Sequence, residues 1–152
     1  MSLSRNADAN IFLANHDVAV LSTVTKSGQV QGAAVYYVPG DDGNIYVLTK
    51  SDTSKAHNML AHPQVAITIY DATELKTIQM QGKAHIEADL KMKRLVFDKM
   101  VRPRNYQGEE IMPPVTDLSF GGYITFRIEP DRISYTNYKD DAALLSSRGQ
   151  HH

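Results

Sequence analysis

Short apolar, β-branched segments separated by turn residues constrain the fold of this chain more than any other feature of its sequence. Turn signals recur about every 8–12 residues in the first half, and Lys26 to Gln29 is typical of a hairpin turn in which Gly28 takes a positive φ. This spacing favours an antiparallel barrel or sandwich with peripheral helices over alternating βαβ units. We expect about seven strands, over residues 18–24, 30–38, 44–49, 65–70, 75–86, 122–128 and 132–135.

Three short helices complete the predicted set of elements. Apolar residues at helical spacing predict helices over residues 6–15, which Asp17 ends, and 89–101. The hydroxyl-rich segment that contains Thr53 predicts a third helix, because threonine and serine are preferred at helix N-termini. We expect residues 105–119 to form a loop.

Composition limits the classes of function that need to be considered. The chain has 152 residues, no cysteine and a net charge of −1, so we expect one globular domain without disulfides, cysteine-ligated metals or a thiol nucleophile. The balanced charge argues against nucleic acid or a membrane surface as partner, and no run of apolar residues is long enough to span a membrane. We see no export signal and expect a cytoplasmic protein. Residues 1–4 and 148–152 are expected to be flexible or left over from cloning.

The segment from Ile45 to Leu60 carries the clearest chemical signal. A strand leads into a hydroxyl-rich turn, and a helix begins near Ser54 and Lys55. The unpaired N–H groups and the dipole of a helix N-terminus favour an anion, and a lysine adds a full positive charge. The residues predict either a phosphate-binding site or an ordinary capped helix with a solvated lysine.

Other polar patterns are less specific. Thr77, Gln79 and Gln81 alternate with apolar residues on one predicted strand, so they form either its solvent face or a polar surface under a flat heterocycle such as a flavin. The basic residues between Lys91 and Arg104 are typical of a solvated helix face. The histidines show no local metal-binding spacing, and we expect no metal site.

Many of these residues, in this order, resemble the FMN-binding split barrel of the pyridoxamine 5'-phosphate oxidase-like superfamily. The resemblance is carried by residues 18–24, 27–37, 44–49, 53–58, 62–66 and 81–84, and returns in 121–123 and 127–133.

The resemblance implies a mainly β fold, a six-stranded antiparallel split barrel that forms a homodimer with FMN in each of two clefts at the interface. It assigns Ser54 and Lys55 to the FMN phosphate, although family members often carry arginine where this chain has Ser54. The full set of flavin-binding residues that it implies is Ala33, Ala34, Val35, Tyr36, Thr49, Ser54, Lys55, Thr77 and Gln79.

The chain departs from true pyridoxamine phosphate oxidases on the substrate side. Those enzymes carry a lysine at the position of Val38, a tyrosine at that of Asp98, and an Arg-x-His-type element after the last strand, which this chain lacks. We therefore expect a short, general family member, an FMN-dependent oxidoreductase acting on an unassigned small-molecule substrate or electron donor. The alternatives are a flavin-binding or sensing protein without catalysis and a split barrel that uses deazaflavin F420 or haem.

Overall fold

The computed structural model describes residues 6–102, 104–106, 108–111 and 122–140, so the expectations for residues 1–4 and 148–152 lie outside it. Its helices are α1 (Ala7–Ala14), α2 (Ser54–Ala61) and α3 (Leu90–Met100). Its strands are β1 (Val18–Val24), β2 (Val30–Pro39), β3 (Ile45–Lys50), β4 (Gln64–Asp71), β5 (Lys76–Ile86), β6 (Arg104–Tyr106), β7 (Glu109–Ile111) and β8 (Tyr123–Asn137). None of the described helices combines the length and the apolar character needed to cross a membrane.

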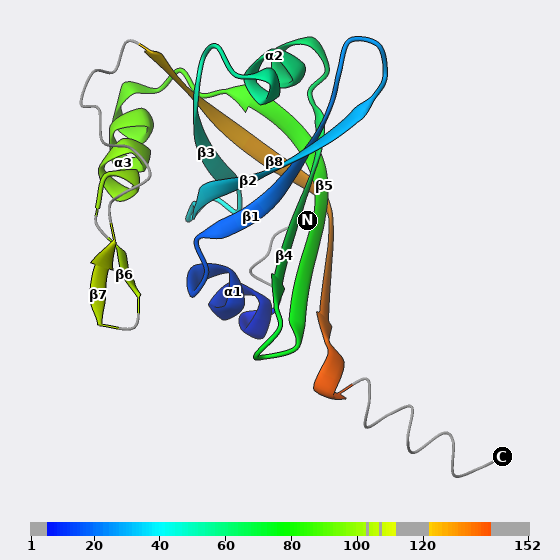
Figure 1. Cartoon of the computed structure of the whole chain (residues 1–152), viewed down its shortest axis with the longest axis vertical. Helices are drawn as coiled ribbons and strands as arrows, with labels where there is room; N and C mark the ends of the chain where they lie inside the picture. Colours follow the sequence, from blue (N-terminus) through cyan, green and yellow to red (C-terminus); the bar gives the residue numbers. More distant parts are fainter. Residues whose placement is uncertain (1–5, 103, 107, 112–121, 141–152) are drawn as a thin grey trace, which may run out of the picture.

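Six strands close into an antiparallel barrel in the order β1-β2-β3-β8-β5-β4 (Figure 1). Closure is completed by β1 and β4, where Leu21 lies opposite Ile67. The hairpin turn between β1 and β2 contains Gly28 at φ 89°, a conformation that glycine adopts without a Cβ clash. The mainly β class and the six-stranded antiparallel barrel are thus confirmed.

Two predictions about the second half of the chain were wrong. Part of the expected loop over 105–119 forms β6 and β7, which pair as a separate two-stranded sheet, and residues 112–121 lie outside the described chain. The two strands expected over 122–128 and 132–135 are one strand, β8, which continues through the segment with Pro130 that was expected to join them. A register shift, in which Gln81 pairs with Arg132 and Gly82 with Pro130, absorbs the irregularity as a bulge. Gly82 is needed there because a Cβ would collide with the Glu129 carbonyl.

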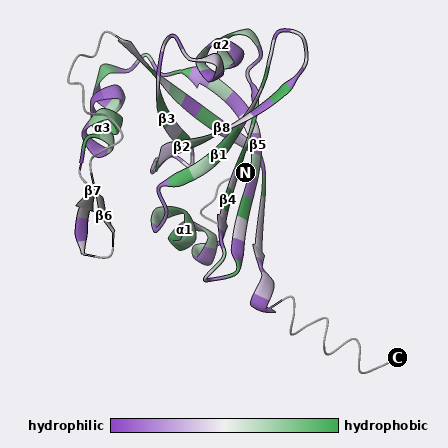
Figure 2. Cartoon of the chain, viewed as in Figure 1, coloured by the Kyte–Doolittle hydropathy of each residue, from purple (hydrophilic) through white to green (hydrophobic). Residues whose placement is uncertain are grey.

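Alternating residues of the barrel strands point inward and make the core. On β5, Ile78 and Met80 are buried and the intervening Gln79 is exposed, as the two-residue period of a strand requires. Figure 2 shows the same alternation as bands of hydrophobic and hydrophilic colour along the barrel strands. A second, smaller cluster joins α3 to the outside of β2 and β3 through Val96, Phe97, Met100, Tyr46 and Val38.

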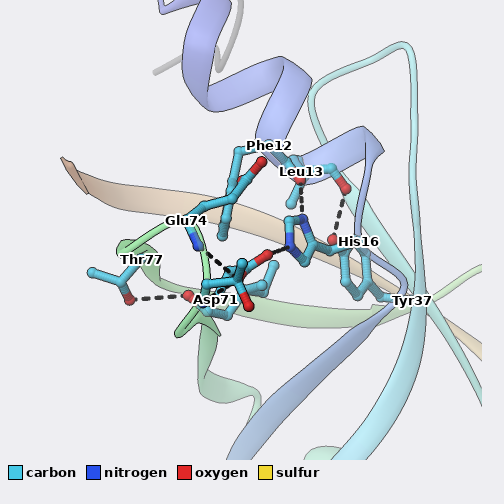
Figure 3. Close-up of polar contacts among 9 residues, drawn as sticks. Phe12, Leu13, His16, Tyr37, Asp71, Glu74 and Thr77 are labelled. Atoms are coloured by element: carbon cyan, nitrogen blue, oxygen red, sulfur yellow. Dashed lines mark hydrogen bonds and ion pairs between the residues drawn. The ribbon is translucent and has the colours of Figure 1, made fainter. Parts of the chain in front are cut away.

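The helices α1 and α2 lie at opposite ends of the barrel (Figure 1). Helix α1 ends at Ala14, with Asn15 rather than Asp17 as its C-cap, and it buries Phe12 and Leu13 in the main core. Polar bonds then attach it to the strands: the Tyr37 hydroxyl donates to the Leu13 carbonyl at 2.6 Å, and the His16 ring bonds to Asp71 (Figure 3). One end of the barrel is therefore closed by apolar side chains.

Candidate functional site

Helix α2 begins where β3 ends, and side-chain hydroxyls fix its first turn. Thr53 is the N-cap, and its hydroxyl accepts the N–H of Ala56 at 3.3 Å and donates to the Lys50 carbonyl at 2.9 Å. The buried Thr49 hydroxyl lies 3.0 Å from that of Thr53. Because these bonds hold the turn from within, the start of α2 has a fixed direction relative to β3.

A cavity of about 370 Å³ opens beside this helix start. It is lined by Thr23, Gln31, Gly32, Ala33, Thr53, Ser54 and Lys55. Three of the nine predicted site residues, Ala33, Ser54 and Lys55, thus meet at one cavity, although they come from β2 and from the start of α2.

The cavity is suited to an anion. The N–H groups of Ser54 and Lys55 belong to the first helical turn, where the backbone has no intrahelical acceptor to offer them. The helix dipole adds partial positive charge at the same place. Lys55 is half-buried and is the charged side chain among the lining residues. Ser54 adds a hydroxyl donor, whereas the Thr53 hydroxyl already donates to the Lys50 carbonyl. The helix N–H groups, Ser54 and Lys55 therefore lie around one small space.

On the side of the cavity formed by β2, the lining residues next to Gln31 have small side chains or none. Gly32 and Ala33 line it, and a Cβ placed on Gly32 would make only an ordinary contact with Val20. Packing within this chain therefore does not require a glycine at position 32. The absence of a side chain at Gly32 leaves room in which another molecule can approach the strand backbone closely.

The remaining residues predicted on β2 and β3 have other surroundings. Val35 is buried with its side chain in the barrel core, so it can offer a ligand only its backbone. Tyr36 packs against the α3 cluster, and Ala34 is exposed on the outer face opposite Val20. Thr49 is 3% exposed and contacts the cavity only through its bond to Thr53.

Thr77 and Gln79 do not meet the other site residues within one chain. Thr77 is the second residue of β5, beside the β4–β5 turn at the α1 end, where its buried hydroxyl donates to the Ile69 carbonyl at 2.9 Å (Figure 3). Gln79 is exposed on the outer face, opposite Thr68. Gln81, which the site prediction omitted, lines a second cavity of about 380 Å³ with Ser22 and Ala66 on that face.

Sequence reasoning missed Thr23, Gln31 and Asn58. Asn58, on α2, is only 8% exposed, and its Nδ2 donates to the Thr23 hydroxyl at 3.0 Å and to Gln31 Oε1 at 2.8 Å. No local pattern in the sequence indicated this role, because the fold determines that Asn58 is buried, and only a buried amide requires hydrogen-bonding partners.

A possible metal-ligand group lies at the α1 end, where local histidine spacing could not have revealed it. Ligand atoms of His16, Asp71 and Glu74 lie within 4.8 Å of one another. In the structure His16 and Asp71 form a hydrogen-bonded ion pair, and the backbone N–H of Glu74 donates to the Asp71 carboxylate. His16 Nδ1 donates to the Phe12 carbonyl at 2.7 Å, and Nε2 lies 2.8 Å from Asp71 Oδ2.

The pKa values of this ion pair follow from its contacts. Burial works against the charged ring of His16, but the bonds to Asp71 and Phe12 and the nearby carboxylates outweigh it and raise its pKa above 6.5. The pKa of Asp71 is lowered by the Glu74 N–H and then by His16. A doubly protonated ring fits both bonds, since the carbonyl and the carboxylate only accept.

Comparison with known proteins gives a consistent result. The family model described as pyridoxamine 5'-phosphate oxidase matches residues 7–137. No curated protein matches the chain. A candidate pyridoxamine 5'-phosphate oxidase from Listeria innocua has a similar structure, with a TM-score of 0.68 and 19% identity over 87% of this chain and 99% of the other.

Two further solved structures share the fold. PhzG from Burkholderia lata 383, in complex with tetrahydrophenazine-1-carboxylic acid, has a TM-score of 0.63 and 16% identity over 85% of this chain and 74% of its own. An F420 reductase has a TM-score of 0.57 and 20% identity over 78% of this chain and 89% of its own. At these identities the likeness shows the fold alone.

Proposed function

The chain belongs to the pyridoxamine 5'-phosphate oxidase family, and from that premise we propose that it binds FMN and acts as an FMN-dependent oxidoreductase. The single observation that carries the proposal is the cavity at the start of α2, where Ser54, Lys55 and Ala33 meet. Its volume of about 370 Å³ suits part of a cofactor rather than a whole protein partner.

The phosphate of FMN is the group that this corner fits best. Lys55 supplies a charge-assisted hydrogen bond, and the N–H groups of Ser54 and Lys55 supply directional ones. The Thr49–Thr53 bond holds the turn in place before a ligand arrives, so little ordering is needed on binding. Bound FMN would supply the hydride or electron chemistry, and the residues of the chain would bind and orient it.

We further propose that two copies of the chain form the complete site. On the outer face of β1, Val18 and Val20 are 44% and 46% exposed, and Tyr70 on β4 is 58% exposed. Exposed apolar side chains gathered on one sheet face favour a protein partner. Thr77 and Gln79 lie far along the barrel from Lys55, so they would share a ligand with a lysine only if the lysine came from a second copy. A homodimer would bring the two halves together.

The proposal is tested on the purified protein after incubation with FMN. Native mass spectrometry reports the number of chains and the mass of the bound cofactor in one measurement, and we expect two chains with two FMN molecules. An absorbance band near 450 nm, as flavins show, should accompany the bound cofactor. Protein that takes up no FMN would refute the function, and a monomer that binds FMN would refute the two-chain site.

Cofactor identity and catalysis need separate experiments. Because an F420 reductase shares the fold, the same titration is run with deazaflavin F420 and with haem, and we expect FMN to bind most tightly. Reduction of the bound flavin by NADPH or NADH is then followed by loss of absorbance. If the protein binds FMN but no donor reduces it, the binding or sensing alternative replaces the oxidoreductase.

A further inference from the structure

An amide bridge from the buried Asn58 to the exposed Gln31 connects α2 to the strand wall of the cavity. Asn58 lies one turn after Lys55 and is 8% exposed. Its Nδ2 donates to Thr23 Oγ1 on β1 at 3.0 Å and to Gln31 Oε1 on β2 at 2.8 Å. Both N–H bonds of the Asn58 amide are thereby used, and two strands are held against the helix.

This bridge sets the direction of the Gln31 amide. A glutamine amide has one accepting end, the oxygen, and one donating end, the NH₂ group. Since Oε1 of Gln31 is bound by Asn58, the NH₂ group is the end left for other partners. Gln31 also lines the cavity that contains Ser54 and Lys55.

The cavity has a need for such a donor. A phosphate monoester carries about −1.5 to −2 charges near neutral pH, and Lys55 is the charged side chain among the cavity's described lining residues. The N–H groups of α2 approach from the helix side. A neutral donor on β2 approaches from the strand side, where Gly32 and Ala33 have no polar side chain to offer.

We infer that Gln31 is a phosphate-contacting residue and that Asn58 is a positioning residue that keeps the NH₂ group of Gln31 directed into the cavity. The pair makes the site select a phosphorylated flavin over its unphosphorylated form. This inference rests on the proposed FMN binding and adds residues that the family resemblance did not supply.

The experiment compares FMN with riboflavin, which lacks the phosphate. The dissociation constants for both are measured by quenching of flavin fluorescence, and their ratio reports the contribution of the phosphate alone. For Gln31→Ala we expect the preference for FMN to fall about three- to tenfold, as for a lost hydrogen bond, with riboflavin affinity unchanged. The matched control is Gln29→Ala, an exposed glutamine of the same hairpin that does not line the cavity.

Asn58→Asp tests the positioning role. Aspartate has nearly the same size but can only accept, so it would bond to the NH₂ group of Gln31 and turn Oε1 toward the phosphate. We expect the preference for FMN to fall further than in Gln31→Ala. Because the new charge could act by itself, the double variant Gln31→Ala/Asn58→Asp is measured too, and most of the effect of Asn58→Asp should disappear in it. Circular dichroism checks that each variant folds.

The outcomes separate this inference from the proposed function. If the unaltered protein binds no FMN, the proposed function fails and the inference fails with it. If it binds FMN and Gln31→Ala leaves the preference over riboflavin unchanged, only the inference is overturned. An effect of Asn58→Asp that persists in full without Gln31 overturns the positioning role of Asn58.

Discussion

The two ends of the barrel are closed in different ways, although the same six strands reach both. At the α1 end, Phe12 and Leu13 fill the opening, and the polar groups of His16, Asp71 and Tyr37 are bonded to one another or to backbone within the chain. At the α2 end, the first N–H groups of the helix and the Lys55 ammonium face a cavity. Within one chain, the contrast indicates that the α1 end contributes to stability and that the lysine-containing cavity lies at the α2 end, so each can be altered separately.

Phe12→Ala should produce the largest effect of all and should affect stability alone. Phe12 is 2% exposed and contacts the rings of His16 and Tyr135, with centroids 4.2 and 6.3 Å away. Its removal leaves a cavity in the core, and we expect the free energy of unfolding to fall by about 3–5 kcal/mol. Urea denaturation measures this loss. Ile11→Ala, at a position 59% exposed on the same helix, is the control.

The separation of the two ends is tested on the same variant. Folded Phe12→Ala protein should bind FMN with nearly unaltered affinity, because Phe12 is buried in the core and is not among the residues that line the cavity at α2. A large loss of affinity in protein that is still folded would show that the two ends are coupled and would contradict the comparison.

Lys55→Ala should have the opposite profile. Loss of a hydrogen bond to a charged group costs about 1.5–3 kcal/mol, so we expect FMN affinity to fall about 10- to 100-fold. Stability should hardly change, since the lysine is only half-buried and in the first turn of α2. Fluorescence titration gives the affinity and urea denaturation the stability. Lys91→Ala, an exposed lysine in the first turn of α3, should alter neither.

Tyr37→Phe tests whether the hydrogen bonds at the α1 end contribute beyond its apolar contacts. Burial raises the pKa of Tyr37 above its ordinary value of 10, so its hydroxyl stays protonated and donates to the Leu13 carbonyl. Removing the hydroxyl leaves that buried carbonyl unpaired, and we expect a loss of about 1–2 kcal/mol in the free energy of unfolding. Tyr138→Phe, at a position 46% exposed, is the matched control. If the two variants were equally stable, the Tyr37 hydrogen bond would contribute nothing to the free energy of unfolding beyond the apolar contacts of the α1 end.

The barrel was predictable because local patterns determine most of it. A few neighbouring residues are enough to predict a strand with alternating burial or a glycine-containing turn such as the one at Gly28. The errors arose where a distant partner decides the outcome. Pro130 would normally break a strand, but the bulge opposite Gly82 lets β8 continue through it.

The residues of the candidate site also fall into those that local sequence predicts and those that depend on a distant partner. Ser54 and Lys55 were predicted from neighbours in sequence, because a helix start is a local feature. Gln31 and Asn58 are 27 residues apart, and His16 and Asp71 are 55 apart, so nothing in their own segments indicates that they meet. Only the closure of the barrel brings such pairs into contact.

The ion pair between His16 and Asp71 makes stability at the α1 end depend on pH in a defined direction. The pKa of His16 is raised above 6.5, so its contribution is full below that pH and is lost as pH rises through the folded-state value. The pKa of Asp71 is lowered from 3.8, so its contribution is present above that pH and is lost as pH falls through the lower value. Between the two ordinary values, both partners are charged and the pair contributes most.

His16→Gln should therefore produce the smallest effect and the one most dependent on pH. The side chain is partly exposed, and solvent screens the pair. We expect the difference in the free energy of unfolding between the original protein and the variant to shrink as pH rises from about 5 to about 8. Urea denaturation at several pH values measures it, and other histidines cancel because both proteins contain them. A difference that stays constant with pH would mean that the ring acts at this end through packing against Phe12, not through its charge.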